Sequence, residues 1–258
     1  MSTAPLLSTR GLAVSIGARV LVASLDLAVQ RGEVWCLLGP NGVGKTTLLH
    51  TLAGARAPSA GSVWLGERAL AERALAEQAC WRGFVPQAVH DAFPAPVLDV
   101  VLQGRHPHLS RWHWEGEADR ALALTALARV GLAGFEARDV TTLSGGERQR
   151  VALATLLTQD PPLALLDEPL AHLDLAQQRR VAELLAAEAR ERGRGLLLSI
   201  HDLSLAQRLA THALLLPGDG RAIAGPAAEV MTEAALSAAF GHPLSAHTAH
   251  GHRWWLPA

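Results

Sequence analysis

Four residues near the start of the chain have the types and the spacing of a loop that binds phosphate groups. The pattern G-x-x-x-x-G-K-[ST], which is typical of nucleotide triphosphatases, is filled by Gly39, Gly44, Lys45 and Thr46. Glycine lets the backbone curl so that successive N–H groups point at phosphate oxygens. A lysine in this position reaches the β- and γ-phosphates, and a threonine hydroxyl can bind Mg²⁺. The pattern therefore predicts a site for a nucleoside triphosphate and Mg²⁺.

The surroundings favour this interpretation over a chance match in a glycine-containing turn. Residues 33–38 form an apolar run of strand length, and residues 47–52 continue a helix that begins at about Lys45 and directs its positive end at the same anion. Lys45 is also the only lysine in the chain. Mutational bias toward arginine codons explains the shortage of lysine. It does not explain why the one lysine lies where a compact ammonium fits and a planar guanidinium does not.

Two neighbouring carboxylates follow a second apolar run. Residues 163–166 read as a buried parallel strand, and Asp167 and Glu168 come directly after it. The carboxyl end of such a strand carries the chemistry of an α/β protein. Asp167 suits a Mg²⁺ ligand through water, and Glu168 suits a general base that polarises an attacking water. The alternative is that the pair caps the next helix, which Pro169 disfavours.

A histidine ends another predicted strand, which spans residues 196–200. A lone histidine is usually structural. His201, however, is expected at the carboxyl end of the strand beside Asp167, where it could sense a γ-phosphate.

A second anion site is predicted at the start of a later helix. Ser144 and Glu147 have the spacing of a capping box that opens a helix at residues 148–159. Gly145 and Gly146 weaken a first turn unless another group must approach the backbone closely. A hydroxyl and two bare N–H groups at a helix N-terminus can bind an anion.

These residues need a sheet that brings the ends of distant strands together. The sequence predicts an α/β fold with a P-loop NTPase core of mixed or parallel sheet, an N-terminal antiparallel β subdomain and an inserted α-helical subdomain. The β subdomain is expected from two short strands joined by a turn at residues 17–19, the second continuing as a half-buried strand at 21–29. A helix is expected at 70–80 and a strand at 84–87. The inserted subdomain is the largely helical stretch 88–140, with breaks at Gly104, Pro107 and Gly131.

Composition bounds the class of protein. The chain has 258 residues, of which 49% are hydrophobic, and a net charge of −1, so it can build a sizeable core and is not expected to bind nucleic acid. The two cysteines, Cys36 and Cys80, fit no disulfide or metal spacing, which suits a reducing compartment. The first residues lack the pattern of a signal peptide, and no apolar run approaches the roughly 18 residues of a membrane span. We therefore expect a soluble, cytoplasmic protein.

Taken in order, the motifs resemble those of the nucleotide-binding subunit of ATP-binding-cassette (ABC) transporters, over residues 6 to about 225. The family motifs are Walker A at 39–46, the Q-loop glutamine Gln87, the signature at 143–147, Walker B at 163–168 and the switch histidine His201. Asp174 matches the D-loop aspartate. The resemblance implies an ATPase with Glu168, His201 and Gln87 as catalytic residues, and with Thr46, Gln87 and Asp167 around Mg²⁺.

The resemblance also implies which residues contact ATP. One group surrounds the phosphates of the bound nucleotide: Gly39, Pro40, Asn41, Gly42, Val43, Gly44, Lys45, Thr46 and Thr47. A second group acts across a head-to-tail homodimer, on the nucleotide held by the partner: Ser144, Gly145, Gly146, Glu147 and Asp174. The family usually stacks adenine on an aromatic residue before the turn at Gly17. Here Ile16 occupies that position and the chain has no tyrosine, so adenine would rest on an aliphatic side chain or on an aromatic from elsewhere.

The resemblance implies one ABC ATPase domain in three parts. These are a core with the β subdomain (1–87 and 160–225), a helical signature subdomain (88–159) and a short C-terminal extension (226–258). The segment 104–108, Gly-Arg-His-Pro-His, is similar to one found in subunits that power import of ferric siderophores, haem and vitamin B12. Such a subunit would act at the cytoplasmic side of the inner membrane, as a homodimer under two copies of a multi-spanning permease served by a periplasmic substrate-binding protein.

Other functions stay open at this stage. The chain could serve an exporter, or it could be a non-transport ABC ATPase such as an iron–sulphur assembly factor. A DNA-repair type would need sustained heptads, which are absent from the sequence. The histidines near 106–113 and 242–252, among them His250-x-His252, could bind a metal. We favour docking of a partner by the first cluster, with Trp112 and Trp114 as apolar anchors, and an ordinary tail for the second.

Overall fold

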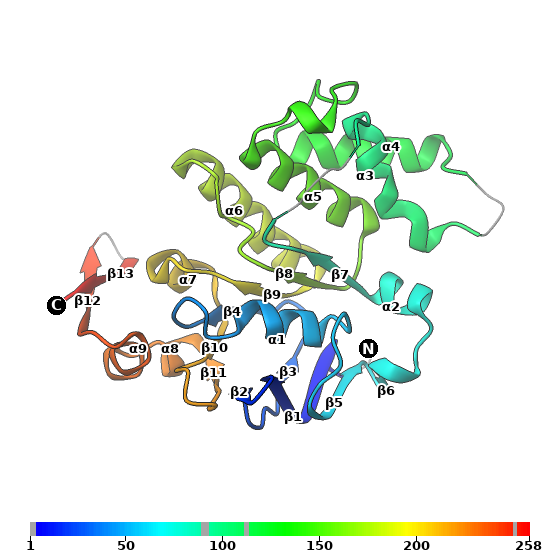
Figure 1. Ribbon diagram of the computed structural model, residues 1–258. Helices are drawn as coiled ribbons and strands as arrows, with labels where there is room; N and C mark the ends of the chain where they lie inside the picture. The colour runs from blue at the N-terminus through cyan, green and yellow to red at the C-terminus, as the bar shows by residue number, and fades with distance from the viewer. Residues whose placement is uncertain (1–3, 89–92, 111–113, 250–251) are drawn as a thin grey trace.

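The computed structural model describes residues 4–88, 93–110, 114–249 and 252–258. Its larger sheet has the strand order β11-β10-β4-β9-β8-β7, in which β11 pairs antiparallel to β10 and the other neighbours are parallel. The strands of this sheet are β4 (Val34–Leu38), β7 (Arg82–Val85), β8 (Leu163–Leu166), β9 (Gly195–Ser199), β10 (His212–Leu215) and β11 (Ile223–Pro226). This mixed, mainly parallel sheet is the core that the sequence predicted (Figure 1).

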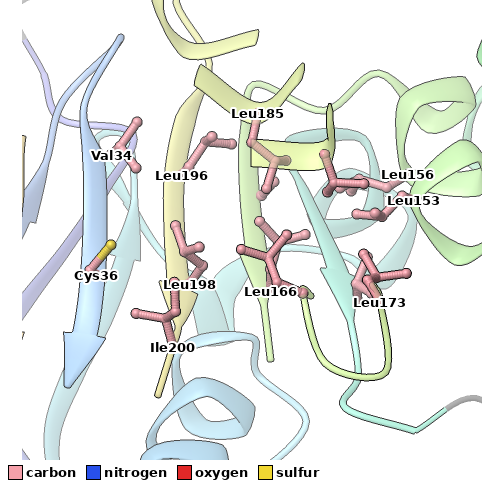
Figure 2. Close-up of a cluster of buried hydrophobic side chains, with 14 of the residues drawn as sticks. Val34, Cys36, Leu153, Leu156, Leu166, Leu173, Leu185, Leu196, Leu198 and Ile200 are labelled. Carbon is pink, nitrogen blue, oxygen red and sulfur yellow. The ribbon is translucent and has the colours of Figure 1, made fainter. Parts of the chain in front are cut away.

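The central strands are buried on both faces, which is why they read as continuous apolar runs. Successive residues of β4 enter different hydrophobic clusters. Trp35 and Leu37 pack with helix α1 (Lys45–Leu52) and the β subdomain. Cys36 and Leu38 pack on the opposite face. Figure 2 shows that second face, where side chains of β4, β8 and β9 meet Leu153 and Leu156 of α5 (Gly145–Gln159) and Leu185 of α6 (Leu175–Arg192).

The N-terminal region forms the expected antiparallel sheet, with the order β2-β1-β5-β6 and β3 beside β1. Its strands are β1 (Leu7–Ile16), β2 (Arg19–Val22), β3 (Ala28–Val29), β5 (Ala60–Leu65) and β6 (Arg68–Ala69). The prediction of a continuous strand at 21–29 is wrong, because β2 ends at Val22 and the chain regains strand pairing only at Ala28. Between these two strands, side chains form hydrogen bonds to the backbone in place of regular strand pairing. The Gly11 N–H donates to the Asp26 carboxylate, and the Thr9 hydroxyl donates to the Leu25 carbonyl.

The helix expected at 70–80 is broken. The structure has a 3₁₀ turn η1 (Leu70–Glu72) and a helix α2 (Leu75–Trp81), with Arg73 extended between them. The buried amide of Gln78 donates to the carbonyls of Leu70 and Arg73. This side chain satisfies backbone groups that a continuous helix would have paired, so the break is stable.

The segment between β7 and β8 is largely helical, as expected, and gathers past β7 on one side of the molecule (Figure 1). It contains α3 (Val97–Leu102), η2 (Gln103–His108), α4 (Glu117–Arg129), η3 (Val140–Thr142) and α5. Gly131 ends α4, but Gly104 and Pro107 do not break the helical path, because both lie inside η2. A Cβ on Gly104 would lie 2.4 Å from the Thr155 carbonyl oxygen. This glycine therefore allows η2 to lie against α5.

The last part of the chain folds back onto the core. After α7 (Leu203–Leu209) and β11 come α8 (Ala227–Val230), α9 (Glu233–Phe240) and a hairpin of β12 (Leu244–Ala249) and β13 (His252–Pro257). The Trp255 side chain is buried, and the backbone N–H of this residue donates to the Ser204 hydroxyl of α7 at 3.1 Å. The extension that the sequence suggested to be an ordinary tail is therefore packed structure.

Candidate functional site

The glycine-rich loop joins β4 to α1, and at two of its glycines close contacts leave no room for a side chain. Gly39, Gly42 and Gly44 have φ angles of 146°, 71° and 115°, which favour glycine. A Cβ at Gly39 would lie 2.5 Å from the Leu216 carbonyl oxygen, and one at Gly44 would lie 2.7 Å from Cδ1 of Leu21. The strand β10 and the β subdomain therefore hold the loop from two sides.

Lys45 is the first residue of α1 and is 6% exposed. Its Nζ donates to the carbonyls of Gly39 (2.8 Å) and Pro40 (3.1 Å). Burial lowers the pKa of this ammonium, and the nearby carboxylates of Glu168 and Asp167 oppose that shift. The lysine is thus a positive charge held inside the loop, in reach of any anion that the loop binds.

Asp167 and Glu168 follow β8, and Ser199 at the end of β9 links them. The Ser199 hydroxyl donates to Oδ1 of Asp167 at 2.6 Å and accepts the Glu168 backbone N–H at 2.8 Å. Asp167 is 1% exposed, and its Oδ2 has no hydrogen-bond partner among the described residues. A buried carboxylate oxygen that accepts no hydrogen bond is costly unless a cation binds to it. The residues present therefore fit Mg²⁺.

Glu168 has a φ of 48°, in the left-handed region that residues other than glycine rarely adopt. Such backbone strain is typical of functional sites. Nε2 of His201 contacts Oε1 of Glu168 directly, so the histidine and the carboxylate predicted from two separate strands meet. Gln87 lies two residues after β7. With β4, β8 and β9, this makes β7 the fourth strand of the sheet to end at the site.

A cavity of about 710 Å³ brings these elements together. Its lining contains the following predicted site residues: Ile16, Asn41, Gly42, Gly44, Lys45, Thr46, Thr47, Gln87, Glu168 and His201. Gly39, Pro40 and Val43 shape the loop from outside this lining, and Val43 is buried. Arg19 and Leu21 also line the cavity, although the sequence reasoning did not select them.

The signature residues lie in a different hollow of about 340 Å³. Ser144, Gly145, Gly146, Glu147 and Asp174 line it with Arg150, His172, Leu173 and Gln177. The two cavities share no lining residue. One chain therefore carries two separate sets of predicted nucleotide contacts.

The capping box is present, and it opens α5 at Gly145 rather than at Arg148. The Ser144 hydroxyl accepts the Glu147 N–H, and the Ser144 N–H donates to the Glu147 carboxylate at 2.8 Å. Hydrogen bonds from the Ser144 hydroxyl and backbone hold the pKa of Glu147 below its usual range. A Cβ on Gly146 would lie 2.9 Å from the His172 carbonyl oxygen. The group that requires a glycine at 146 thus belongs to this same chain.

The histidine clusters show no metal site within the part of the chain that the structure describes, where no group of three or more His, Cys, Asp or Glu side chains could hold an ion. Nε2 of His106 lies 3.3 Å from the Glu115 carboxylate, and Nε2 of His108 hydrogen-bonds the Gln159 carbonyl. Trp112, His113 and His250 lie outside the described residues. None of the helices described has the length and apolarity to cross a membrane.

Comparison with known proteins identifies the family. The family model described as "ABC transporter" matches residues 22–171. The chain belongs to the ABC transporter family. It is therefore an ATP-binding protein and an ABC-type ATPase.

Two curated ABC relatives match nearly the whole chain. A hemin import ATP-binding protein of Streptomyces coelicolor is 40% identical over 238 residues, which cover 91% of this chain and 82% of the relative. An iron(3+)-hydroxamate import ATP-binding protein of Bacillus subtilis is 36% identical over 234 residues, with coverages of 91% and 87%.

Solved ABC structures share the fold. A metal-chelate type ABC transporter in an inward-facing conformation superposes with a TM-score of 0.86 at 28% identity, covering 98% of this chain and 97% of the other. A bacterial ABC transporter cassette solved as a dimer gives a TM-score of 0.74 at 25% identity, with coverages of 85% and 98%.

Proposed function

We propose that this ABC ATPase powers import of a metal chelate, haem or a ferric siderophore, through a membrane permease. The observation that carries the proposal is the similarity, over nine tenths of the chain, to a hemin importer subunit and an iron(3+)-hydroxamate importer subunit. The likeness to a metal-chelate type transporter points the same way. Vitamin B12, the third chelate expected from the sequence, belongs to the same class on the resemblance alone.

Within one subunit, the proposed roles follow from the geometry of the 710 Å³ cavity. The loop N–H groups and Lys45 bind the phosphates of ATP. Thr46, Gln87 and Asp167 would hold Mg²⁺, which supplies charge neutralisation of the phosphates when bound. Glu168 accepts a proton from the attacking water as general base. His201, in contact with Glu168, orients that carboxylate and faces the γ-phosphate end.

Two subunits are needed for a complete site, because the signature hollow and the loop cavity of one chain are separate. In the proposed head-to-tail homodimer, Ser144 and Gly146 of one copy close on the ATP held by Lys45 of the other, and Asp174 lies at the same junction. ATP then joins the subunits and hydrolysis separates them. The dimeric form of a similar cassette supports the pairing of two copies.

The proposal also assigns a role to each part of the chain. Residues 1–87 and 160–225 form the nucleotide-binding core, 88–159 the signature and docking subdomain, and 226–258 the extension. The dimer would sit at the cytoplasmic side of the inner membrane under two permease copies, with a periplasmic binding protein delivering the chelate. An exporter subunit or an iron–sulphur assembly ATPase is less favoured, because both relatives described above are import proteins.

A pair of variants tests the ATPase mechanism. Glu168→Gln keeps the size of the side chain but removes the base, so ATP-stabilised dimers should persist while phosphate release falls by about 10²–10⁴-fold. Ser144→Arg should abolish both dimer formation and turnover, because a bulky cation fills the signature hollow. Size-exclusion chromatography with Mg-ATP and a phosphate-release assay measure the two effects. Substantial turnover in Glu168→Gln would remove Glu168 from the catalytic role.

The cargo needs a separate experiment. The subunit, assembled with its permease in proteoliposomes, should support uptake of haem or of a ferric hydroxamate from a loaded binding protein, and Lys45→Ala should abolish that uptake. Cobalamin and a chelate-free amino acid serve as comparison cargos. Uptake of the amino acid, or outward movement of the chelate, would contradict the importer assignment.

A further inference from the structure

The nucleotide cavity lacks an aromatic surface for a purine base. None of the described residues that line it is Trp, Tyr or Phe. The one ring in the lining, His201, contacts Glu168 and so belongs to the phosphate end. Ile16, at the position where the sequence led us to expect the base, is 49% exposed. The aliphatic side chain of Ile16 offers apolar contact area to a base but no π surface for stacking.

Arg19 stands beside Ile16 and lines the same cavity. The two residues are direct partners across the end of the β1–β2 hairpin, whose turn contains Gly17 with a φ of 57°. Leu21, two residues further along β2, packs against the phosphate-loop glycine Gly44. Arg19 and Leu21 both line the cavity, so Arg19 lies on the side of the hairpin end that faces the phosphate loop.

The guanidinium of Arg19 is not engaged elsewhere. The side chain is exposed, and it makes no hydrogen bond, ion pair or ring contact with the residues that the structure describes. Two other arginines of this subdomain already have partners. Arg10 lies 3.9 Å over the Trp64 ring, and Arg56 donates to the Ser15 carbonyl at 2.7 Å. Arg19 is thus a planar cation at the edge of the cavity that is available to a ligand.

We propose that Arg19 stacks its guanidinium plane on the adenine ring of the bound nucleotide, with Ile16 packing against the edge of the base. A guanidinium is planar and weakly hydrated, and it stacks on nucleobases as it does on aromatic side chains. Its positive charge is attracted to the π face of the purine. The pair supplies what one aromatic side chain would otherwise provide. This inference rests on the proposed assignment of the cavity to nucleotide.

Calorimetry with two ligands that differ only by adenosine tests the proposal. MgADP contains the base, and Mg-pyrophosphate contains the phosphates alone. Arg19→Ala should weaken ADP binding by about three- to thirtyfold and leave pyrophosphate binding unchanged. Arg19→Lys keeps the charge but loses the plane, so it should lose most of the same ADP affinity. Arg10→Ala, a matched control in the same subdomain outside the cavity, should bind both ligands like the native chain.

The results distinguish a failure of the stacking proposal from a failure of the assignment of the cavity to nucleotide. Equal weakening of ADP and pyrophosphate in Arg19→Ala would make Arg19 a phosphate ligand and overturn the stacking proposal. Unchanged ADP affinity, or full affinity in Arg19→Lys, would also overturn it. Lys45→Ala reports on the site itself. If that variant binds both ligands as tightly as the native chain, the cavity is not the nucleotide site.

Discussion

The hydroxyl of Ser199 ties together two carboxylates that the proposed mechanism treats separately. It donates to the buried Asp167 and receives the backbone N–H of Glu168, whose φ is in the left-handed region. A serine in this position can therefore fix the orientation of the Mg²⁺ ligand and the backbone of the general base at the same time. It acts through those residues, as a positioning residue.

Ser199→Ala should lower both the stability of the protein and its apparent affinity for Mg²⁺. The change leaves Oδ1 of the buried Asp167 without a donor, which costs about 1–3 kcal/mol of unfolding free energy. It also frees the carboxylate to rotate, so the Mg²⁺ concentration for half-maximal ATPase activity should rise. Thermal unfolding and a Mg²⁺ titration of phosphate release measure both. Loss of stability with an unchanged Mg²⁺ titration would show that Ser199 is only structural.

At the residue scale, the sequence predicted those site residues whose charge is unusual among their sequence neighbours. Lys45 stands out among glycines, and Asp167 and Glu168 stand out after an apolar strand. Ser199 and Arg19 were missed, because a serine in a buried strand and an arginine after a turn are ordinary in sequence. Ser199 matters because its hydroxyl hydrogen-bonds Asp167 of the neighbouring strand segment. Arg19 matters because it pairs with Ile16 across the β1–β2 hairpin. Both depend on how distant segments meet.

At the scale of the element, helix α5 is stabilised at its start by the Ser144–Glu147 capping box. Because Ser144 lowers the pKa of Glu147, ionised Glu147 stabilises the folded state. That contribution is complete above the unfolded-state pKa of about 4.3 and is lost as the pH falls through the lower folded-state pKa. The helix start should therefore weaken in acid.

Comparison of the native chain with Glu147→Gln tests this pH dependence. At neutral pH the variant should lose about 0.3–1 kcal/mol of unfolding free energy, because the first turn loses a negative charge. The difference should begin to shrink below about pH 4.3, where the unfolded chain binds a proton at Glu147, and should vanish once the carboxyl of the folded state is protonated as well. Denaturant unfolding at a series of pH values measures it. A difference that stays constant down to pH 3.5 would assign the effect to packing.

Elements were predicted well where apolar periodicity is long and bounded. Helix α6 spans 175–192 as expected, and the buried strands differ from prediction by a residue or two. The errors at 21–29 and 70–80 share one cause. In both places, side chains of Thr9, Asp26 or Gln78 hydrogen-bond to backbone groups. The pattern of apolar residues does not record hydrogen bonds of this kind.

At the scale of the whole molecule, the helical subdomain presents aromatic side chains to solvent. Trp114 is 89% exposed and Phe93 is 80% exposed. Trp112, the other expected anchor, lies outside the described residues. Exposed aromatic side chains are typical anchors of a protein interface. Because this subdomain extends away from the C-terminal hairpin (Figure 1), a permease could dock on it without contacting β12 or β13.

Replacement of Trp112 and Trp114 by alanine should lower copurification with the permease while ADP binding by the isolated subunit is retained. Trp254→Ala is a matched control, because Trp254 is also exposed, at 41%, but lies on β13 at the far side of the molecule. Loss of assembly in the control alone would move the docking surface to the hairpin. Unchanged assembly in the double variant would leave the exposed tryptophans without a docking role.

The burial of Lys45 has a consequence for covalent chemistry on this protein. The chain offers amine-directed reagents only its α-amine and the Nζ of Lys45. That Nζ is buried and held by two carbonyl groups. Reagents used for surface attachment should therefore react first at the α-amine. Molecules coupled to a sensor chip in this way would share one point of attachment.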